Sequence, residues 1–82
     1  MKRIALISII VEDMNSVESL NAILHEYASC IIGRMGLPCR ERGISLISVA
    51  VDAEQDMISA LSGKIGRLHG ISAKAVYSKA EN

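Results

Sequence analysis

Aromatic residues are almost absent from this chain, whose 82 residues include no Phe, no Trp and only two Tyr. The hydrophobic core is therefore expected to be aliphatic, built from Ile, Leu, Val, Met and Ala. We expect a single domain over residues 1–82, because a chain this short supports one modest core and buries only about 60% of its unfolded surface.

An excess of either charge is also absent, since nine basic and nine acidic residues cancel without forming a long block of one sign. This balance argues against a nucleic-acid-binding stripe and against a polybasic membrane patch. The apolar stretch at residues 4–11 ends at Glu12 and Asp13. It is short for a signal peptide and far below the roughly 20 apolar residues of a membrane span. We therefore expect a cytoplasmic protein that contacts neither nucleic acid nor membrane directly.

Metal-binding and catalytic motifs are missing as well. Cys30 and Cys39 form no CxxC pair, and with His25 and His69 they form no HxxxH or HxH pattern. The two thiols are interpreted as reduced, structural or incidental residues, and no metal site is expected. No GxxxxGK[ST] loop, GxGxxG element or nucleophile with a recognisable base is present, so we expect that the protein is not an enzyme.

The first half of the chain reads as a strand followed by a helix. Residues 4–11 are rich in β-branched side chains and apolar on both alternating faces, which is typical of a strand covered on both sides. From residue 17 to residue 28, apolar side chains recur every three or four positions, as on one stripe of an amphipathic helix. Asn15 or Ser16 is expected to cap this helix.

The next segment reads as a hairpin. Residues 29–37 form a predicted strand that is bent or bulged near Gly33 and Gly36, because both glycines and the following Pro38 disfavour a helix. Residues 38–43 carry the charges and the final glycine of a surface turn, and residues 44–51 form a second strand that is apolar on both faces.

A second helix and a final strand complete the pattern. Asp52 and Gln55 resemble a capping box, and Gly70 is expected to end the helix. Gly63 and Gly66 lie within it, so that it either packs closely on the sheet or frays. The apolar stripe of this helix consists of Met57, Ile58, Leu61, Ile65 and Leu68. Residues 71–78 are a predicted strand, and residues 79–82 a polar tail.

The order βαββαβ predicts an α+β, ferredoxin-like fold: a four-stranded antiparallel sheet with both helices on one face. The second face of the strands at 4–11 and 44–51 would then expose Ile, Leu and Val to water. A patch of that size is an aggregation liability on a monomer. We therefore predict a homo-oligomer, a dimer or a tetramer, assembled through its sheets.

The most distinctive polar residue is Arg34, which lies between Gly33 and Gly36. A guanidinium on a strand of small residues is suited to bind a carboxylate or phosphate in a bidentate manner. The alternative is an exposed strand arginine paired with Glu26, Glu41 or a neighbouring subunit. His25 is either a partly exposed histidine at the edge of the helix or a contact for a ligand or metal. His69 is expected to be a histidine suited to the C-terminal end of a helix.

The segment IIGRMGLP, preceded by HEY and followed by RERGISLISVAVDA and ISALSGKIGRL, resembles a family of iron-only hydrogenase system regulators. The resemblance runs from about residue 3 to residue 78. It implies an ACT-like fold, self-association and a regulatory role around hydrogenase assembly, with the effector unknown.

The ligand-sensing domain of the nickel-responsive repressor has the same fold, and His25-Glu26 resembles the HEH segment of its metal site. Aligned without gaps, the other ligand positions of that site fall near Gly36, Pro38 and Ile44, which are not ligand types. The nickel site is therefore not expected here. Nor is its DNA-binding segment, because no residues precede the first strand to form one.

We conclude that the sequence favours a cytoplasmic ACT-like regulatory module that binds a small effector near subunit interfaces. The expected ligand-binding residues are His25, Gly33, Arg34 and Gly36, and the sequence leaves any cofactor unknown. Two alternatives remain open: an interaction module that docks a hydrogenase-maturation protein without a small ligand, and a metal sensor.

Overall fold

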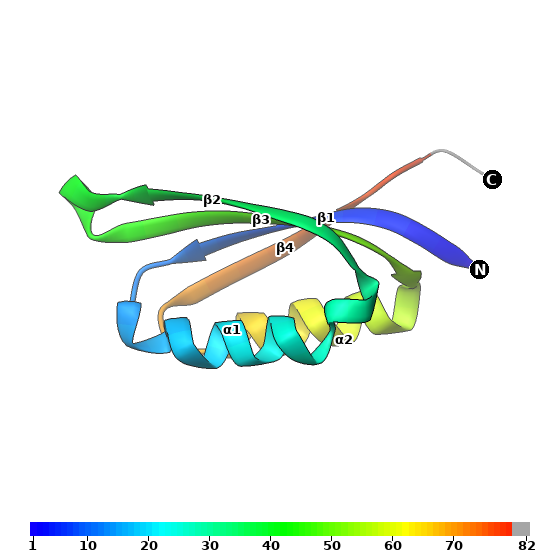
Figure 1. The fold of residues 1–82 in the computed structure, drawn as a ribbon, viewed down its shortest axis with the longest axis horizontal. Helices are drawn as coiled ribbons and strands as arrows, with labels where there is room; N and C mark the ends of the chain where they lie inside the picture. The colour runs from blue at the N-terminus through cyan, green and yellow to red at the C-terminus, as the bar shows by residue number, and fades with distance from the viewer. Residues whose placement is uncertain (80–82) are drawn as a thin grey trace.

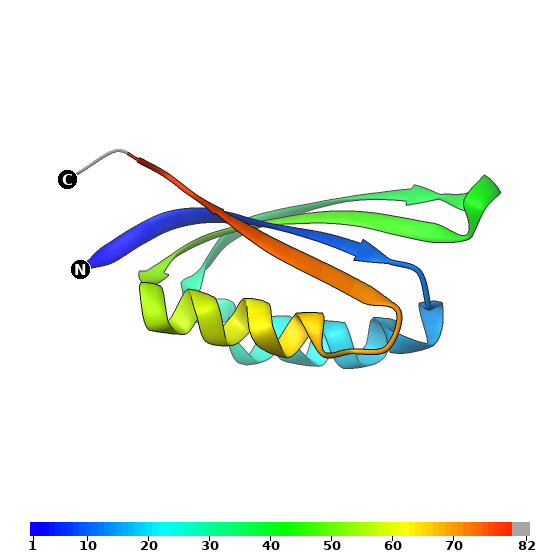
Figure 2. The same ribbon diagram turned by 180° about the vertical axis from the view of Figure 1, so that it is seen from behind.

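The computed structural model describes residues 1–79, which fold into a four-stranded antiparallel sheet with two helices on one face (Figures 1 and 2). The elements follow one another as β1 (Lys2–Val11), α1 (Val17–Glu26), β2 (Ile31–Cys39), β3 (Ile44–Glu54), α2 (Gln55–Gly66) and β4 (Ile71–Tyr77). The strand order is β2-β3-β1-β4. This confirms the predicted ferredoxin-like fold. Of the predicted polar tail, residues 80–82 lie outside the described part of the chain.

The core lies between the sheet and the helices and is aliphatic, as predicted. Alternate residues of β1, from Ala5 to Val11, point toward the helices and are at most 1% exposed. Val49 and Val51 of β3 are fully buried beside them, because antiparallel pairing places them opposite Ile7 and Ala5. The buried helical side chains are Leu20, Leu24, Ile58, Leu61 and Ile65.

Within residues 1–79, the opposite side of the sheet carries no layer of helices (Figure 1). Large apolar side chains from all four strands are exposed there, because successive strand residues point to opposite faces. We call this surface the outer sheet face. Its exposed large apolar residues are Ile4, Leu6, Ile10, Met35, Leu37, Leu46 and Val76.

The β2–β3 hairpin matches the expected bend and turn. The register shifts between Ile31 and Gly33, which is the predicted bulge. A short 3-10 helix at Arg40–Arg42 and Gly43, with φ of 67°, connect the strands. The tip of this hairpin projects past the beginning of α1 (Figure 1).

The predicted caps of both helices are wrong in part. Ser16 occupies the N-cap position of α1 but makes no side-chain cap bond, and Asp13 caps the preceding 3-10 helix instead. Asp52 does not open α2, because β3 continues to Glu54 with Asp52 opposite Ile4 in the ladder with β1. Sheet pairing therefore prevails over the local capping signal.

The end of α2 also differs from the prediction. The helix ends at Gly66, so Gly70 follows in the turn before β4. Gly63 and Gly66 do not pack closely on the sheet, since a Cβ at Gly66 would meet nothing within 4 Å and one at Gly63 only the Arg67 guanidinium. Met57 is not a core residue: it is 45% exposed, and its sulfur lies 3.7 Å from Cys30 Sγ.

Candidate functional site

Arg34 lies on β2, an edge strand that pairs only with β3. Its register partner is the buried Val49, so the Arg34 side chain points to the helical side of the sheet. There Arg34 Nη1 donates to Asn21 Oδ1 of α1 at 3.3 Å. The alternative pairing with Glu26 or Glu41 is not formed within residues 1–79, where the exposed Arg34 guanidinium bonds this neutral amide and Glu26 pairs with Lys64.

Gly33 and Gly36 flank Arg34 but do not share one surface. Gly36 lies on the same side as Arg34, whereas Gly33 pairs with Ala50 and lies on the outer side, next to the bulge. A Cβ added at Gly33 would meet nothing within 4 Å, and one at Gly36 would make only ordinary contacts, the nearest being Ile47 Cγ1 at 3.8 Å. Neither glycine has a positive φ. The fold of the single chain therefore requires a glycine at neither position.

His25 is exposed and occupies the last turn of α1. It follows Asn21 by four residues, a spacing that places two side chains on the same side of a helix. The structure thus brings Arg34 into contact with Asn21, which lies one turn before His25 on α1. The sequence did not single out Asn21, because its only distinctive features are that it is polar and that it lies one helical turn before His25.

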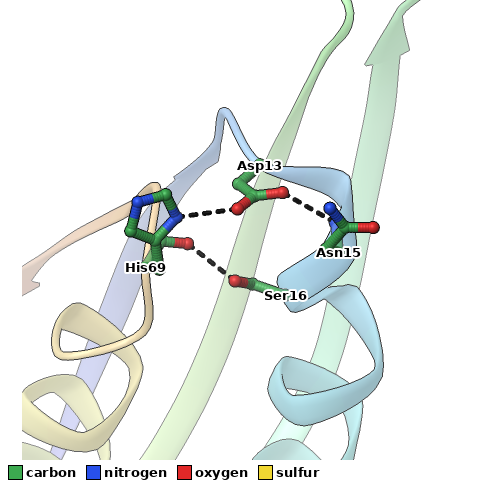
Figure 3. Close-up of polar contacts among 4 residues, drawn as sticks. All are labelled: Asp13, Asn15, Ser16 and His69. Carbon is green, nitrogen blue, oxygen red and sulfur yellow. Dashed lines mark hydrogen bonds and ion pairs between the residues drawn. The ribbon is translucent and has the colours of Figure 1, made fainter.

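A second polar cluster joins the loop after β1 to the loop before β4 (Figure 3). His69 Nδ1 lies 2.7 Å from Asp13 Oδ2, and the other oxygen of Asp13 accepts the Asn15 backbone N–H at 2.9 Å. The Ser16 hydroxyl donates to the His69 carbonyl at 2.7 Å. Because it is committed to that carbonyl and not to the imidazole, the three side chains do not form a catalytic triad.

This cluster stabilises the ionised form of Asp13. The Asn15 backbone N–H, and next the hydrogen bond from His69, lower the pKa of Asp13 below its ordinary value. The His69 side chain is 88% exposed, whereas Asp13 is 27% exposed. His69 was expected to interact with the end of a helix, and its contact with a carboxylate 56 residues away has no local signal in the sequence.

Gly70 fits closely against the same cluster. Its φ is 69°, and a Cβ on it would lie 2.4 Å from Asp13 Cβ and 2.9 Å from the Asp13 backbone nitrogen. The Glu12 backbone N–H donates to the Gly70 carbonyl at 2.7 Å. Residues 12–16 and 69–70 therefore act as a structural connection between two loops.

Other kinds of site have less support. Within residues 1–79, no group of three or more His, Cys, Asp or Glu side chains is placed to hold a metal ion. A shallow depression of about 420 Å³ lies on the outer sheet face between β2 and β3, lined by Met35, Gly36, Leu37, Leu46 and Ser48. No helix in the described part of the chain is long and apolar enough to cross a membrane.

Comparisons with known proteins agree with this fold. The profile of the TM1266-like family, described as "Iron-only hydrogenase system regulator, putative", matches residues 3–75. The structure of uncharacterized protein TM1266 from Thermotoga maritima is 32% identical over 96% of this chain and 100% of that chain, with a TM-score of 0.92.

A formyltetrahydrofolate deformylase from Pseudomonas putida KT2440 contains the same fold at 13% identity and a TM-score of 0.66. The match covers 94% of this chain and 29% of the deformylase, so it shows the fold alone. No curated protein sequence matches the chain.

Proposed function

We propose, from the premise that the chain belongs to the TM1266-like family of iron-only hydrogenase system regulators, that it acts by binding a small effector rather than by catalysis. The proposed contacts are those of the β2 edge and the neighbouring side of α1. Arg34 and His25 would make the polar contacts, and Gly36 would leave room for the ligand on the same side of β2. Gly33 would leave the opposite side of the strand open. The proposed effector class is a small carboxylate or phosphate.

The observation that carries this proposal is the exposed Arg34 guanidinium on the same side of β2 as Gly36. Glycine in a strand costs about 0.5–1 kcal/mol relative to alanine, yet neither a positive φ nor a close contact within the chain calls for it at Gly33 or Gly36. Room for an approaching ligand accounts for Gly36, which lies on the Arg34 side of β2. Gly33 lies on the other side, next to the bulge, where strand glycines are common. One Arg34 donor is used by Asn21, and the planar guanidinium has others that can bind a carboxylate or phosphate in parallel.

A thermal-shift screen tests this proposal directly. Amino acids, nucleotides and divalent metal ions are added singly, and calorimetry then measures the affinity of each compound that raises Tm. We expect Arg34→Ala to abolish binding, while Arg42→Ala, a matched arginine in the exposed turn, preserves it. An effector that binds both variants equally, or a screen without a stabilising compound, would overturn the proposed site.

The regulatory role is tested in a host that produces an iron-only hydrogenase. Deleting the gene for this chain should change hydrogenase activity, and complementation with the wild-type gene should restore it. Measuring hydrogenase transcript alongside activity separates an effect on transcription from one on assembly. Unchanged transcript and activity in the deletion strain would refute the regulatory role.

The second candidate is an interaction module that docks a hydrogenase-maturation protein and binds no small ligand. The exposed apolar side chains of the β2–β3 hairpin favour it, since Met35 is 74% and Leu37 70% exposed. Affinity capture with purified maturation proteins distinguishes the candidates: a stable complex that forms without added effector and persists in Arg34→Ala supports docking.

A further inference from the structure

The single chain exposes more surface than its mass accounts for. Its accessible area is 5610 Å², whereas a folded monomer of 8.8 kDa exposes about 4800 Å² by the general scaling of area with mass. The excess of about 800 Å² is similar in size to the area that each partner buries in a standard protein interface. Within residues 1–79, the outer sheet face is the large apolar surface without a covering layer, and it is therefore the surface that a partner would cover.

The outward-pointing side chains of the outer sheet face lie in rows across the strands. The strand register aligns Ile10 with Leu46 and Leu37 in one row across the sheet, and Val76 with Leu6 and Ala50 in another. Between these rows lie Ser8 and Ser48, opposite one another on the two central strands. Lys74 and Met35 lie in the same row on the two outer strands, so the small side chains make a hollow that is limited to the two central strands. An apolar side chain of a second copy would fit into such a hollow.

Charge supports the same occupant. Between Ile4 and Ile10 on β1, and between Leu46 and Ala50 on β3, the residues that point outward are all uncharged. The charged side chains of this face lie toward its margins, two of each sign: Lys2, Lys74, Asp52 and Glu54. A charge-free centre with a polar margin is typical of interfaces, and equal numbers of both signs avoid net repulsion between identical copies.

The sheet edges are less suited to pairing between chains. β2 has a bulge between Ile31 and Gly33 and contains Pro38, and β4 carries Lys74 at its centre. Bulges, prolines and lysines are the features that protect edge strands from further pairing. The face, in contrast, has no such protection at its centre.

We propose that a second copy of this chain covers the outer sheet face, so that two sheets pack face to face about a two-fold axis, about 10 Å apart. The proposal does not depend on the existence of a small effector. In this dimer the depression between Met35, Leu37 and Leu46 would receive an apolar side chain of the second copy.

Sedimentation velocity across a range of micromolar concentrations tests the proposal. Wild-type protein should sediment with the mass of two chains, and Leu46→Glu and Leu6→Glu should each weaken the dimer at least about 100-fold, because each change places two uncompensated charges in a two-fold interface. The matched control is Met57→Glu, since Met57 on α2 has similar exposure to Leu46, 45% against 41%, but lies in the helical layer.

Circular dichroism verifies that the variants are folded. We expect folding to be retained, because the three substituted residues are partly exposed in the single chain. Dissociation by both outer-face substitutions together with an intact Met57→Glu dimer supports the proposal. A monomeric wild type overturns it, and so does an assembly that both outer-face substitutions leave unchanged. A wild-type monomer that binds a purified maturation protein through Leu46 would assign the face to that protein instead.

Discussion

Replacing Gly70 with alanine should destabilise the fold far more than replacing Gly43, although both glycines have nearly the same left-handed backbone. Their φ values are 69° and 67°. A Cβ in this conformation costs about 1–2 kcal/mol, and the smaller conformational freedom of alanine in the unfolded chain returns about 0.4–1 kcal/mol of that. We therefore expect Gly43→Ala, whose added Cβ meets nothing within 4 Å, to cost about 1 kcal/mol.

At Gly70 the added Cβ also collides with Asp13. Separations of 2.4 Å from Asp13 Cβ and 2.9 Å from the Asp13 nitrogen are not tolerated by real Cβ atoms, so one loop must move. That movement strains the 2.7 Å hydrogen bond from Glu12 N–H to the Gly70 carbonyl, and losing such a bond costs about 0.5–1.5 kcal/mol. Overpacking that forces the backbone to shift costs about 1–3 kcal/mol, the strained hydrogen bond included. We therefore expect Gly70→Ala to cost about 3 kcal/mol in total, about 2 kcal/mol more than Gly43→Ala.

Urea denaturation followed by circular dichroism measures both costs. It should be performed at one protein concentration, because association makes apparent stability depend on concentration. A loss of about 3 kcal/mol corresponds to a decrease in Tm of roughly 12–24 °C for a domain of this size. Equal costs for the two variants would refute the argument that contact with Asp13, and not φ alone, determines the requirement for glycine.

Three further outcomes are expected from the same measurements. Gly33→Ala and Gly36→Ala should leave stability unchanged or raise it by up to about 1 kcal/mol, since neither Cβ meets a close neighbour and glycine weakens strands; a large loss in either variant would contradict the proposed role of these glycines. Ile58→Ala should cost about 2–5 kcal/mol, because Ile58 is 1% exposed in the core; a loss below 1 kcal/mol would contradict this. The pKa of Asp13 is lowered in the fold, first by the Asn15 N–H, so its ionised form stabilises the fold above the unfolded pKa and this contribution is lost as pH falls through the folded pKa. Asp13→Asn should therefore show a smaller decrease in stability between pH 5 and about pH 2 than the wild type, and equal decreases would argue against this role.

The spacing of apolar residues predicted the fold, because it shows which side chains of each strand and helix share one face and are buried together. In β1, alternation placed Ile7 and Ile9 on one face and Leu6 and Ile10 on the other, but both faces are apolar and the pattern did not indicate which of them the helices bury. The same alternation also predicted that the second face of the sheet is apolar, and in the described residues no helical layer covers that face. The prediction at Met57 was wrong because a position at the margin of a helical stripe depends on the rotation of the helix against the sheet, which spacing does not specify.

Contacts between distant loops were beyond sequence reasoning. Asp13 and His69 are separated by 56 positions, and each has a plausible local role as a helix cap or a helix-end residue. Their meeting depends on β1 and β4 being antiparallel neighbours, so that the loops after β1 and before β4 lie at the same end of the sheet. Arg34 and Asn21 are a similar case, because their contact depends on where α1 lies relative to the edge strand.

The proposed effector site and the proposed dimer face share strand β2. Arg34 pairs with the buried Val49 and points toward the helical side, whereas the next residue, Met35, pairs with Ser48 on the outer sheet face. A ligand that repositions β2 through Arg34 therefore also repositions Met35 in the dimer. By thermodynamic linkage, any change that the ligand makes in dimer affinity is returned as an equal change in ligand affinity. We expect an effector found in the screen to bind wild type and the monomeric Leu46→Glu variant with affinities that differ at least about 5-fold, measured by calorimetry. Identical affinities would show that the two sites on β2 act independently.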